Sequence, residues 1–246
     1  MDWCRFHASG KDGNEVTDQS AQFDAYAKTY VDEVNRSIAF MGLKVDFATR
    51  VKAGYLLDLL GQHFGDSRKV RLLDIGCGTG GSHPLIADKL AGLCATDVSA
   101  ASVAEAAAKN AGIDYRAYDG VRLPYDDHQF DAAMTICVMH HVPPAQWPAF
   151  AAEMKRIVRP GGLALVFEHN PLNPLTRRAV SNCEFDADAV LLGQRRTRAL
   201  LGDAGFSAIK SRSILSVPSF GPGSRALDFA LGRFSLGAQY VASGVS

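Results

Sequence analysis

The sequence predicts an α/β protein whose sheet is doubly wound and mainly parallel. Three observations lead to this class. Strand-like runs alternate with helical segments from Val70 to His169, and a glycine-rich stretch follows the first strand. The end of the chain carries two strand-like runs with no strong helix between them. Alternating strands and helices imply right-handed crossovers between parallel strands, whereas the final pair is expected to be antiparallel at one edge of the sheet.

The composition narrows the classes of partner and the cell compartment. The 246 residues include 26 basic and 26 acidic side chains, a balance that argues against nucleic acid or an anionic membrane as partner. No apolar run approaches the roughly 20 residues of a membrane span. The five cysteines form no CxxC pair. We therefore expect reduced thiols in a cytoplasmic protein, with no disulfide framework and no metal site.

The chain is expected to have three parts. Residues 1–19 are polar and are predicted to be poorly ordered. Residues 20–66 are predicted to form two helices, the first with Phe23, Tyr26 and Tyr30 on its apolar face and the second beginning at Asp46 as N-cap. Residues 67–246 are predicted to form the sheet domain.

Within the sheet domain, the elements can be placed in order. Strands are expected at 70–75, 93–97, 113–118, 130–139, 163–169, 207–215 and 236–243. Helices are expected after Gly80, after Ser99 as N-cap, from Trp147 to Val158, over 195–206, and for a short stretch from about Arg225. The stretch 159–162 is expected to be a turn, and 170–176 a loop, because its two prolines block regular pairing.

The glycine-rich stretch predicts a ligand site. Gly76, Gly78 and Gly81 match G-x-G-x-x-G after the first strand, and glycine lets the backbone approach a ligand closely. A parallel sheet binds ligands beyond the carboxyl ends of its strands. Asp97 ends the second strand, where an acid can accept hydrogen bonds from ribose hydroxyls. NAD, FAD and S-adenosylmethionine all fit these features.

Asp74 distinguishes between these ligands. It lies in the strand just before the glycines, where a carboxylate would repel the phosphates of a dinucleotide but attract a sulfonium and an ammonium. Asp119 and Gly120 follow the third strand, where an acid can accept from an adenine amino group. The stretch ICVMHHV, residues 136–142, closes the fourth strand, where carbonyl groups can meet the methionine end.

Five motifs in this order resemble the class I S-adenosylmethionine-dependent methyltransferases. They are LLDIGCGTGG, ATDVS, YDG, FDAAMTICVMHHV and KRIVRPGGLALVFEH. The resemblance is close from about Leu56 to Gly205, and within the family it is strongest to bacterial enzymes that act on small molecules. It implies a Rossmann-like, seven-stranded sheet with an antiparallel last strand, and N-terminal helices that cover the cofactor pocket as a lid.

The resemblance also implies the reaction and the residues that bind the cofactor. The cofactor would be S-adenosylmethionine, the product S-adenosylhomocysteine, and the acceptor an oxygen or nitrogen nucleophile of a small molecule. The implied cofactor-binding residues are Asp74, Gly76, Cys77, Gly78, Gly80, Asp97, Val98, Asp119, Gly120 and Cys137. Cys77 and Cys137 are expected to pack near the pocket without a nucleophilic role.

Proton removal from the acceptor would need a base at the same edge. The candidates are His141 and His169, with His140 and Glu168 beside them. Of the two neighbouring histidines, His140 is expected to turn inward, since successive residues of a strand face opposite sides. Tyr26 and Tyr30 are lid candidates that could close over the sulfonium; the alternative is that they form the buried face of their helix.

Two other functions remain open. One is a non-catalytic protein that binds S-adenosylmethionine on the same fold. The other is an NAD-dependent oxidoreductase, which Asp74 and the two helices ahead of the glycine-rich stretch disfavour.

Overall fold

The computed structural model describes residues 23–24, 29–217 and 222–246. Seven of its strands form one sheet in the order β3-β2-β1-β4-β5-β7-β6. β7 is antiparallel to both β5 and β6, and the pairings among β1 to β5 are parallel. The predicted doubly wound sheet with an antiparallel last strand is therefore confirmed. The strands are β1 (Arg71–Ile75), β2 (Gly92–Asp97), β3 (Asp114–Ala117), β4 (Phe130–Ile136), β5 (Val158–His169), β6 (Ser207–Ile214) and β7 (Gln239–Val245).

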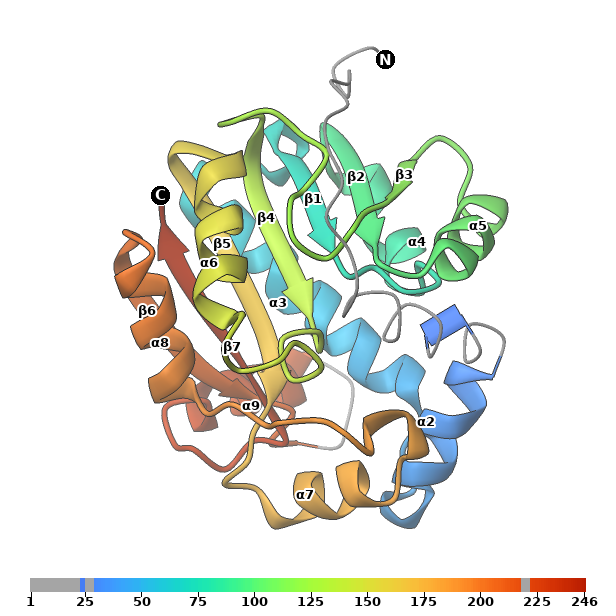
Figure 1. Ribbon diagram of the computed structural model, residues 1–246. Helices are drawn as coiled ribbons and strands as arrows, with labels where there is room; N and C mark the ends of the chain where they lie inside the picture. Colours follow the sequence, from blue (N-terminus) through green and yellow to red (C-terminus); the bar gives the residue numbers. More distant parts are fainter. Residues whose placement is uncertain (1–22, 25–28, 218–221) are drawn as a thin grey trace.

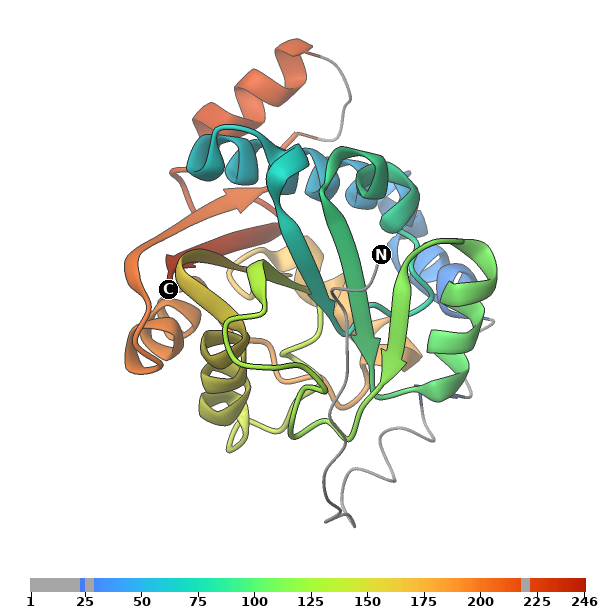
Figure 2. The same ribbon diagram turned by 90° about the horizontal axis from the view of Figure 1, so that it is seen from above.

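Helices cover both faces of this sheet (Figure 1 and Figure 2). On one face, α6 and α8 contribute Met154 and Leu200 to a buried apolar cluster. On the other face, α3 and α4 contribute Leu56 and Ile86 to a second cluster. The helices are α2 (Tyr30–Ile38), α3 (Val45–Phe64), α4 (His83–Ile86), α5 (Ala100–Lys109), α6 (Trp147–Ile157), α7 (Pro174–Ser181), α8 (Gln194–Asp203) and α9 (Pro222–Leu231). Among the described residues, no helix combines the length and hydropathy that crossing a bilayer needs.

A third group of elements lies beyond the carboxyl ends of the central strands. α2 and α7 pack against each other there, together with the short 3-10 helix η4 (Glu184–Asp186) (Figure 1). The predicted ligand residues after β1, β2, β4 and β5 lie at this same edge. This group therefore covers the edge at which the candidate site is built.

Helix α7 stands where the sequence predicted a loop. Asn173 is its N-cap, and its Oδ1 accepts hydrogen bonds from the backbone N–H groups of Leu175 (2.9 Å) and Thr176 (3.1 Å). Pro174 occupies the first helical position, where its missing N–H is not needed and its fixed φ suits a helix. The proline that blocks strand pairing here begins a helix instead.

Three smaller expectations were also wrong. Lys44 rather than Asp46 precedes α3, and Asp46 lies in the first turn, where its Oδ2 accepts from Arg50 Nε at 2.8 Å. Residues 159–162 belong to β5 and pair with the C-terminus, where Ser246 N donates to Gly162 O at 2.9 Å. Cys94 is disulfide-bonded, whereas Cys77, Cys137 and Cys183 are free thiols. The expectations for residues 1–19 and for Tyr26 fall outside the described residues, and for Tyr30 only the backbone is described.

Candidate active site

The glycine-rich loop after β1 has the backbone conformation that its sequence requires. Gly76, Gly78 and Gly80 have φ values of 77°, 52° and 69°, which side chains rarely permit. A Cβ on Gly76 would lie 2.4 Å from Val138 Cγ2, so this glycine permits close packing against the end of β4. A Cβ on Gly78 would meet no described atom within 4 Å. Gly78 therefore faces open space beside the loop.

Asp97, at the end of β2, holds this loop in place. Its Oδ2 accepts from Gly78 N at 2.8 Å, and its Oδ1 accepts from Ser99 N at 2.9 Å. The side chain of Ser99 in turn caps α5. Asp97 is 8% exposed, and its burial raises the pKa of the carboxyl group. The residue predicted to meet a ribose is thus also a structural link between the loop and α5.

Asp74 lies beneath the same loop and is almost fully buried. Its Oδ2 is 2.9 Å from His83 Nε2, and His83 Nδ1 hydrogen-bonds the hydroxyl of Tyr115. Asp74 Oδ1 is buried without a hydrogen-bond partner among the described residues. Oδ2 of Asp74 is therefore bound within the protein, and Oδ1 is an acceptor that can bind a ligand.

Asp119 and Cys77 have local structural roles in the described chain. Asp119 Oδ1 accepts from Val121 N and Arg122 N, each at 2.9 Å, which fixes the turn after β3. Burial, together with the charges of Asp74 and Asp97, raises the pKa of the Cys77 thiol. A thiol that stays protonated is a poor nucleophile. Contacts from Asp119, Val98 and Gly120 to a cofactor stay predictions.

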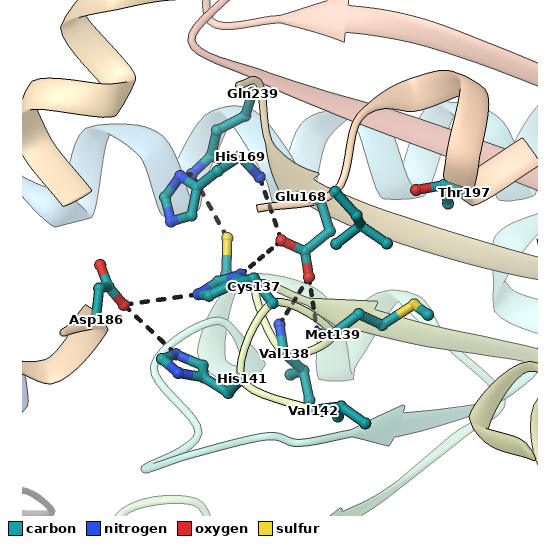
Figure 3. A network of polar contacts seen from close by, with 12 residues as sticks. Cys137, Val138, Met139, His141, Val142, Glu168, His169, Asp186, Thr197 and Gln239 are labelled. Carbon is teal, nitrogen blue, oxygen red and sulfur yellow. Dashed lines mark hydrogen bonds and ion pairs between the residues drawn. The ribbon is translucent and has the colours of Figure 1, made fainter. Parts of the chain in front are cut away.

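The second part of the site is a polar cluster after β4 and β5, and Glu168 is its centre (Figure 3). Glu168 Oε1 accepts from Val138 N at 3.1 Å and Met139 N at 2.8 Å. Its Oε2 accepts from His169 N at 3.3 Å and lies 2.6 Å from His140 Nδ1. Because Glu168 is 0% exposed and fully occupied, it orders the turn after β4 and is not free to act as a base.

His140 lies between two carboxylates. Its Nε2 is 3.6 Å from Asp186 Oδ1, on the side of the ring away from Glu168. Burial alone would lower the pKa of this imidazole, but the charge of Glu168 and the bond to Asp186 raise it well above its usual value. His140 is therefore protonated near neutral pH and cannot accept a proton, which removes it from the candidate bases.

His140 turns inward, as expected, and is 1% exposed, but strand alternation is not the reason. β4 ends at Ile136, and the two histidines lie in the turn that follows. His141 Nε2 is 3.4 Å from the same Asp186 oxygen that His140 approaches. One ligand atom from each of these three residues lies within 4.8 Å of the others. Imidazole and carboxylate groups at such distances can bind a divalent cation. In the described structure the positive charge of this cluster is the imidazolium of His140, which lies between Glu168 and Asp186.

His141 and His169 are the neutral histidines of the cluster. Burial and the neighbouring charge of His140 lower the pKa of each ring to about 4. His169 Nδ1 lies 3.4 Å from the side-chain amide of Gln239, at the start of β7. The ring of Phe23 packs edge-on against His141, with 5.3 Å between the ring centroids. Both predicted bases therefore have the charge state that a base needs near pH 7.

Three residues of the cluster were missed by the sequence: Lys52, Asp186 and Gln239. Lys52, on α3, is 8% exposed, and its Nζ is 3.8 Å from Cys137 Sγ. Gln239 Nε2 is 3.5 Å from the same sulfur. Lys52 had a usable signal, because it lies one turn before Leu56 on the buried face of its helix. Asp186 and Gln239 follow no motif.

The comparisons with known proteins identify a methyltransferase domain in this chain. A family model described as a methyltransferase domain matches residues 73–166, which include the glycine-rich loop, Asp97 and the turn after β4 but not Glu168 or His169. The demethylmenaquinone methyltransferase of Beutenbergia cavernae is 32% identical over 151 residues. That alignment covers 61% of this chain and 58% of the relative, so it spans little more than half of that protein.

Solved structures share the fold at low sequence identity. A protein of Thermotoga maritima described as an SAM-dependent methyltransferase, possible histamine N-methyltransferase, superposes with a TM-score of 0.64 at 19% identity. The match covers 92% of this chain and 98% of that chain. The cyclase SpnF has a TM-score of 0.57 at 20% identity, over 78% of this chain and 80% of its own. The chain therefore contains a methyltransferase domain over residues 73–166, and its seven-stranded sheet has the fold of solved S-adenosylmethionine-dependent methyltransferases.

Proposed function

We propose that this protein transfers a methyl group from S-adenosylmethionine to an oxygen or nitrogen atom of a small molecule. The observation that carries the proposal is the combination of a buried acceptor at Asp74 with open space at Gly78. Asp74 Oδ1 is a buried acceptor without a partner among the described residues, and Gly78 opens the loop above it. A cationic ligand without phosphates satisfies such an acceptor, whereas a dinucleotide would place its phosphates against the carboxylate.

The residues around the loop fit the rest of that cofactor. Asp97 uses one lone pair of each oxygen for Gly78 N and Ser99 N, so each oxygen can accept a second bond from a ribose hydroxyl. When bound, the cofactor supplies a methyl group activated by a positive sulfur. The protein must then orient the acceptor, exclude water and, for a protonated acceptor, remove a proton.

We assign the base to His169, with His141 as the second candidate. A neutral imidazole accepts through one nitrogen only when the other carries the proton. The Gln239 amide determines which nitrogen of His169 carries the proton. When the amide is turned over, its oxygen can accept a hydrogen bond from Nδ1–H of His169. In that orientation Oε1 has His169 Nδ1 as its partner, and Nε2 takes the buried position at which Oε1 otherwise has no partner among the described residues. The Nε2 lone pair of His169 is then free to take the proton.

The N-terminal segment is proposed to cover this site. Asp24 Oδ1 accepts from Ser99 Oγ at 2.5 Å and from Ala101 N at 3.1 Å, next to the end of β2. Phe23 packs against both His141 and Phe185, with ring centroids 5.3 Å apart in each case. Residues just before α2 thus contact both the cofactor side and the acceptor side, as a lid would.

A second candidate function is binding of the same cofactor without methyl transfer. The fold is compatible with it, because the cyclase SpnF shares the architecture at a TM-score of 0.57 and fold alone does not determine chemistry. Calorimetric titration with S-adenosylmethionine, S-adenosylhomocysteine and NAD tests the proposal. We expect the first two to bind and NAD not to bind; binding of NAD alone would refute it. Tight binding of S-adenosylmethionine without turnover on any acceptor would favour the second candidate.

A further inference from the structure

Lys52 is a buried cation at the acceptor side of the site, and no carboxylate of the described residues forms an ion pair with it. It is 8% exposed, on the face of α3 that packs against the sheet. Among the described residues, its Nζ donates one hydrogen bond, to Cys137 Sγ at 3.8 Å, and it takes part in no ion pair. Leaving a charge buried and unpaired is strongly unfavourable. A negatively charged partner would stabilise the buried ammonium of Lys52.

The neighbouring groups within the described part of the chain do not supply that negatively charged partner. Burial raises the pKa of the Cys137 thiol, so the sulfur next to Lys52 is uncharged near neutral pH. The two carboxylates of the polar cluster face His140 instead, Glu168 at 2.6 Å and Asp186 at 3.6 Å. The ammonium of Lys52 therefore lies beside a neutral sulfur.

Gln239 adds a second unmatched polar group around the same sulfur. It is also 8% exposed, and its Nε2 lies 3.5 Å from Cys137 Sγ while Oε1 is buried without a partner among the described residues. Turning the amide over exchanges the two ends, and either end has hydrogen-bonding capacity to spare. Lys52 from α3 and Gln239 from β7 thus meet around one sulfur. Gln239 Nε2 also lies 3.4 Å from His169 Nδ1.

We infer that Lys52 and Gln239 form an anion-binding site for the methyl acceptor, and that the acceptor is a small molecule carrying an oxygen anion. The anion pairs with Lys52, and the amide of Gln239 binds a polar group beside it. This arrangement places the anionic end of the acceptor next to His169. The inference rests on the proposed function, because it takes this edge of the sheet to be the acceptor side.

The first test is the stability of unliganded Lys52→Met, a substitution that keeps the length of the side chain and removes its charge. We expect thermal unfolding of the variant at a temperature several degrees above that of the wild type, because an unpaired buried charge is lost. If Lys52 instead stabilised the fold by anchoring α3, the variant would unfold at a lower temperature, and that result would overturn the inference. Lys69→Met removes an exposed ammonium and should leave the unfolding temperature unchanged.

The second test measures anion binding directly. Protein saturated with S-adenosylhomocysteine is titrated calorimetrically with salicylate, a carboxylate beside a hydroxyl group, and with salicylamide as its uncharged counterpart. We expect salicylate to bind the wild type at least about tenfold more tightly than Lys52→Met, the scale of one charge-assisted hydrogen bond. Gln239→Leu should weaken it less, and Lys69→Met not at all. Salicylamide should not distinguish the variants.

Two outcomes separate this inference from the proposed function. Binding of S-adenosylhomocysteine, with salicylate affinity absent or equal in wild type and Lys52→Met, would contradict the anion site alone. Binding of salicylate through Lys52, without any binding of S-adenosylhomocysteine, would support the anion site and contradict methyl transfer.

Discussion

Replacing Asp97 by alanine should affect both the stability of the glycine-rich loop and its affinity for the cofactor. The carboxylate accepts from Gly78 N at 2.8 Å and from Ser99 N at 2.9 Å. Hydrogen bonds to a charged group contribute about 1.5–3 kcal/mol each. Gly78 is partly exposed, so water can replace part of what is lost at its N–H group, whereas Ser99 is fully buried. We therefore expect a loss of about 2–4 kcal/mol in the free energy of unfolding.

Affinity for the cofactor should fall as well. If Asp97 also accepts the ribose hydroxyls, Asp97→Ala removes roughly 2–3 kcal/mol of binding free energy. This corresponds to a Kd for S-adenosylhomocysteine about 30- to 150-fold higher. Asp97→Asn keeps one acceptor oxygen but loses the charge, so both losses should be smaller than those of Asp97→Ala.

Calorimetric titration with S-adenosylhomocysteine and denaturant unfolding measure the two effects separately. Asp88→Ala is the matched control, because Asp88 is an exposed carboxylate whose Oδ1 accepts from Lys89 at 2.8 Å, away from the loop. It should leave both quantities unchanged. A folded Asp97→Ala protein that binds S-adenosylhomocysteine as tightly as the wild type would refute the assignment.

Four further predictions concern the polar cluster and the lid. Glu168→Gln breaks a buried ion pair with His140, so we expect a loss of about 3–5 kcal/mol in the free energy of unfolding; a loss below about 1 kcal/mol in urea unfolding would contradict this. His169→Ala, assayed with the true acceptor, should lower turnover at least about tenfold without changing cofactor affinity, and His141→Ala is the parallel test of the second candidate. Because the pKa of His169 is lowered to about 4, its neutral form persists as the pH falls, and the wild-type rate should not decline through the ordinary histidine range near about 6.5. If His169→Ala and His141→Ala both leave turnover unchanged, the base hypothesis fails. Hydrogen exchange across residues 20–40 should slow when S-adenosylhomocysteine binds, and equal rates with and without it would exclude a lid.

The cofactor side of the site was predictable because its geometry is local in sequence. Asp74 and Gly78 lie in one strand–turn–helix unit, whose conformation follows from the glycines. Asp97 ends the next strand, and parallel pairing of β1 with β2 brings it beside the loop. The sequence could also have predicted α7, because Asn173 followed by Pro174 is a helix start; the prolines were interpreted only as strand breakers.

The acceptor side was less predictable because its contacts join distant parts of the chain. Lys52 and Gln239 reach Cys137 from 85 and 102 residues away, respectively. Asp186 comes from η4, in a stretch with no motif. The surroundings of His140 depend on where β4 ends. The expected strand ended at Met139, three residues after its actual end at Ile136, so His140 and His141 lie in a turn and do not alternate as strand residues would. Strand ends are set by tertiary contacts, which hydrophobic patterning does not specify.

The most direct test of methyl transfer to a small molecule uses S-adenosylmethionine with a deuterated methyl group. The protein is incubated with this cofactor and a small-molecule fraction of a bacterial extract, and the products are analysed by mass spectrometry. We predict that S-adenosylhomocysteine and a deuteromethylated small molecule accumulate in equal amounts. The labelled product should be strongly reduced with His169→Ala and absent without protein. Binding of S-adenosylmethionine with no labelled small molecule, or with label only in protein or nucleic acid, would contradict the account.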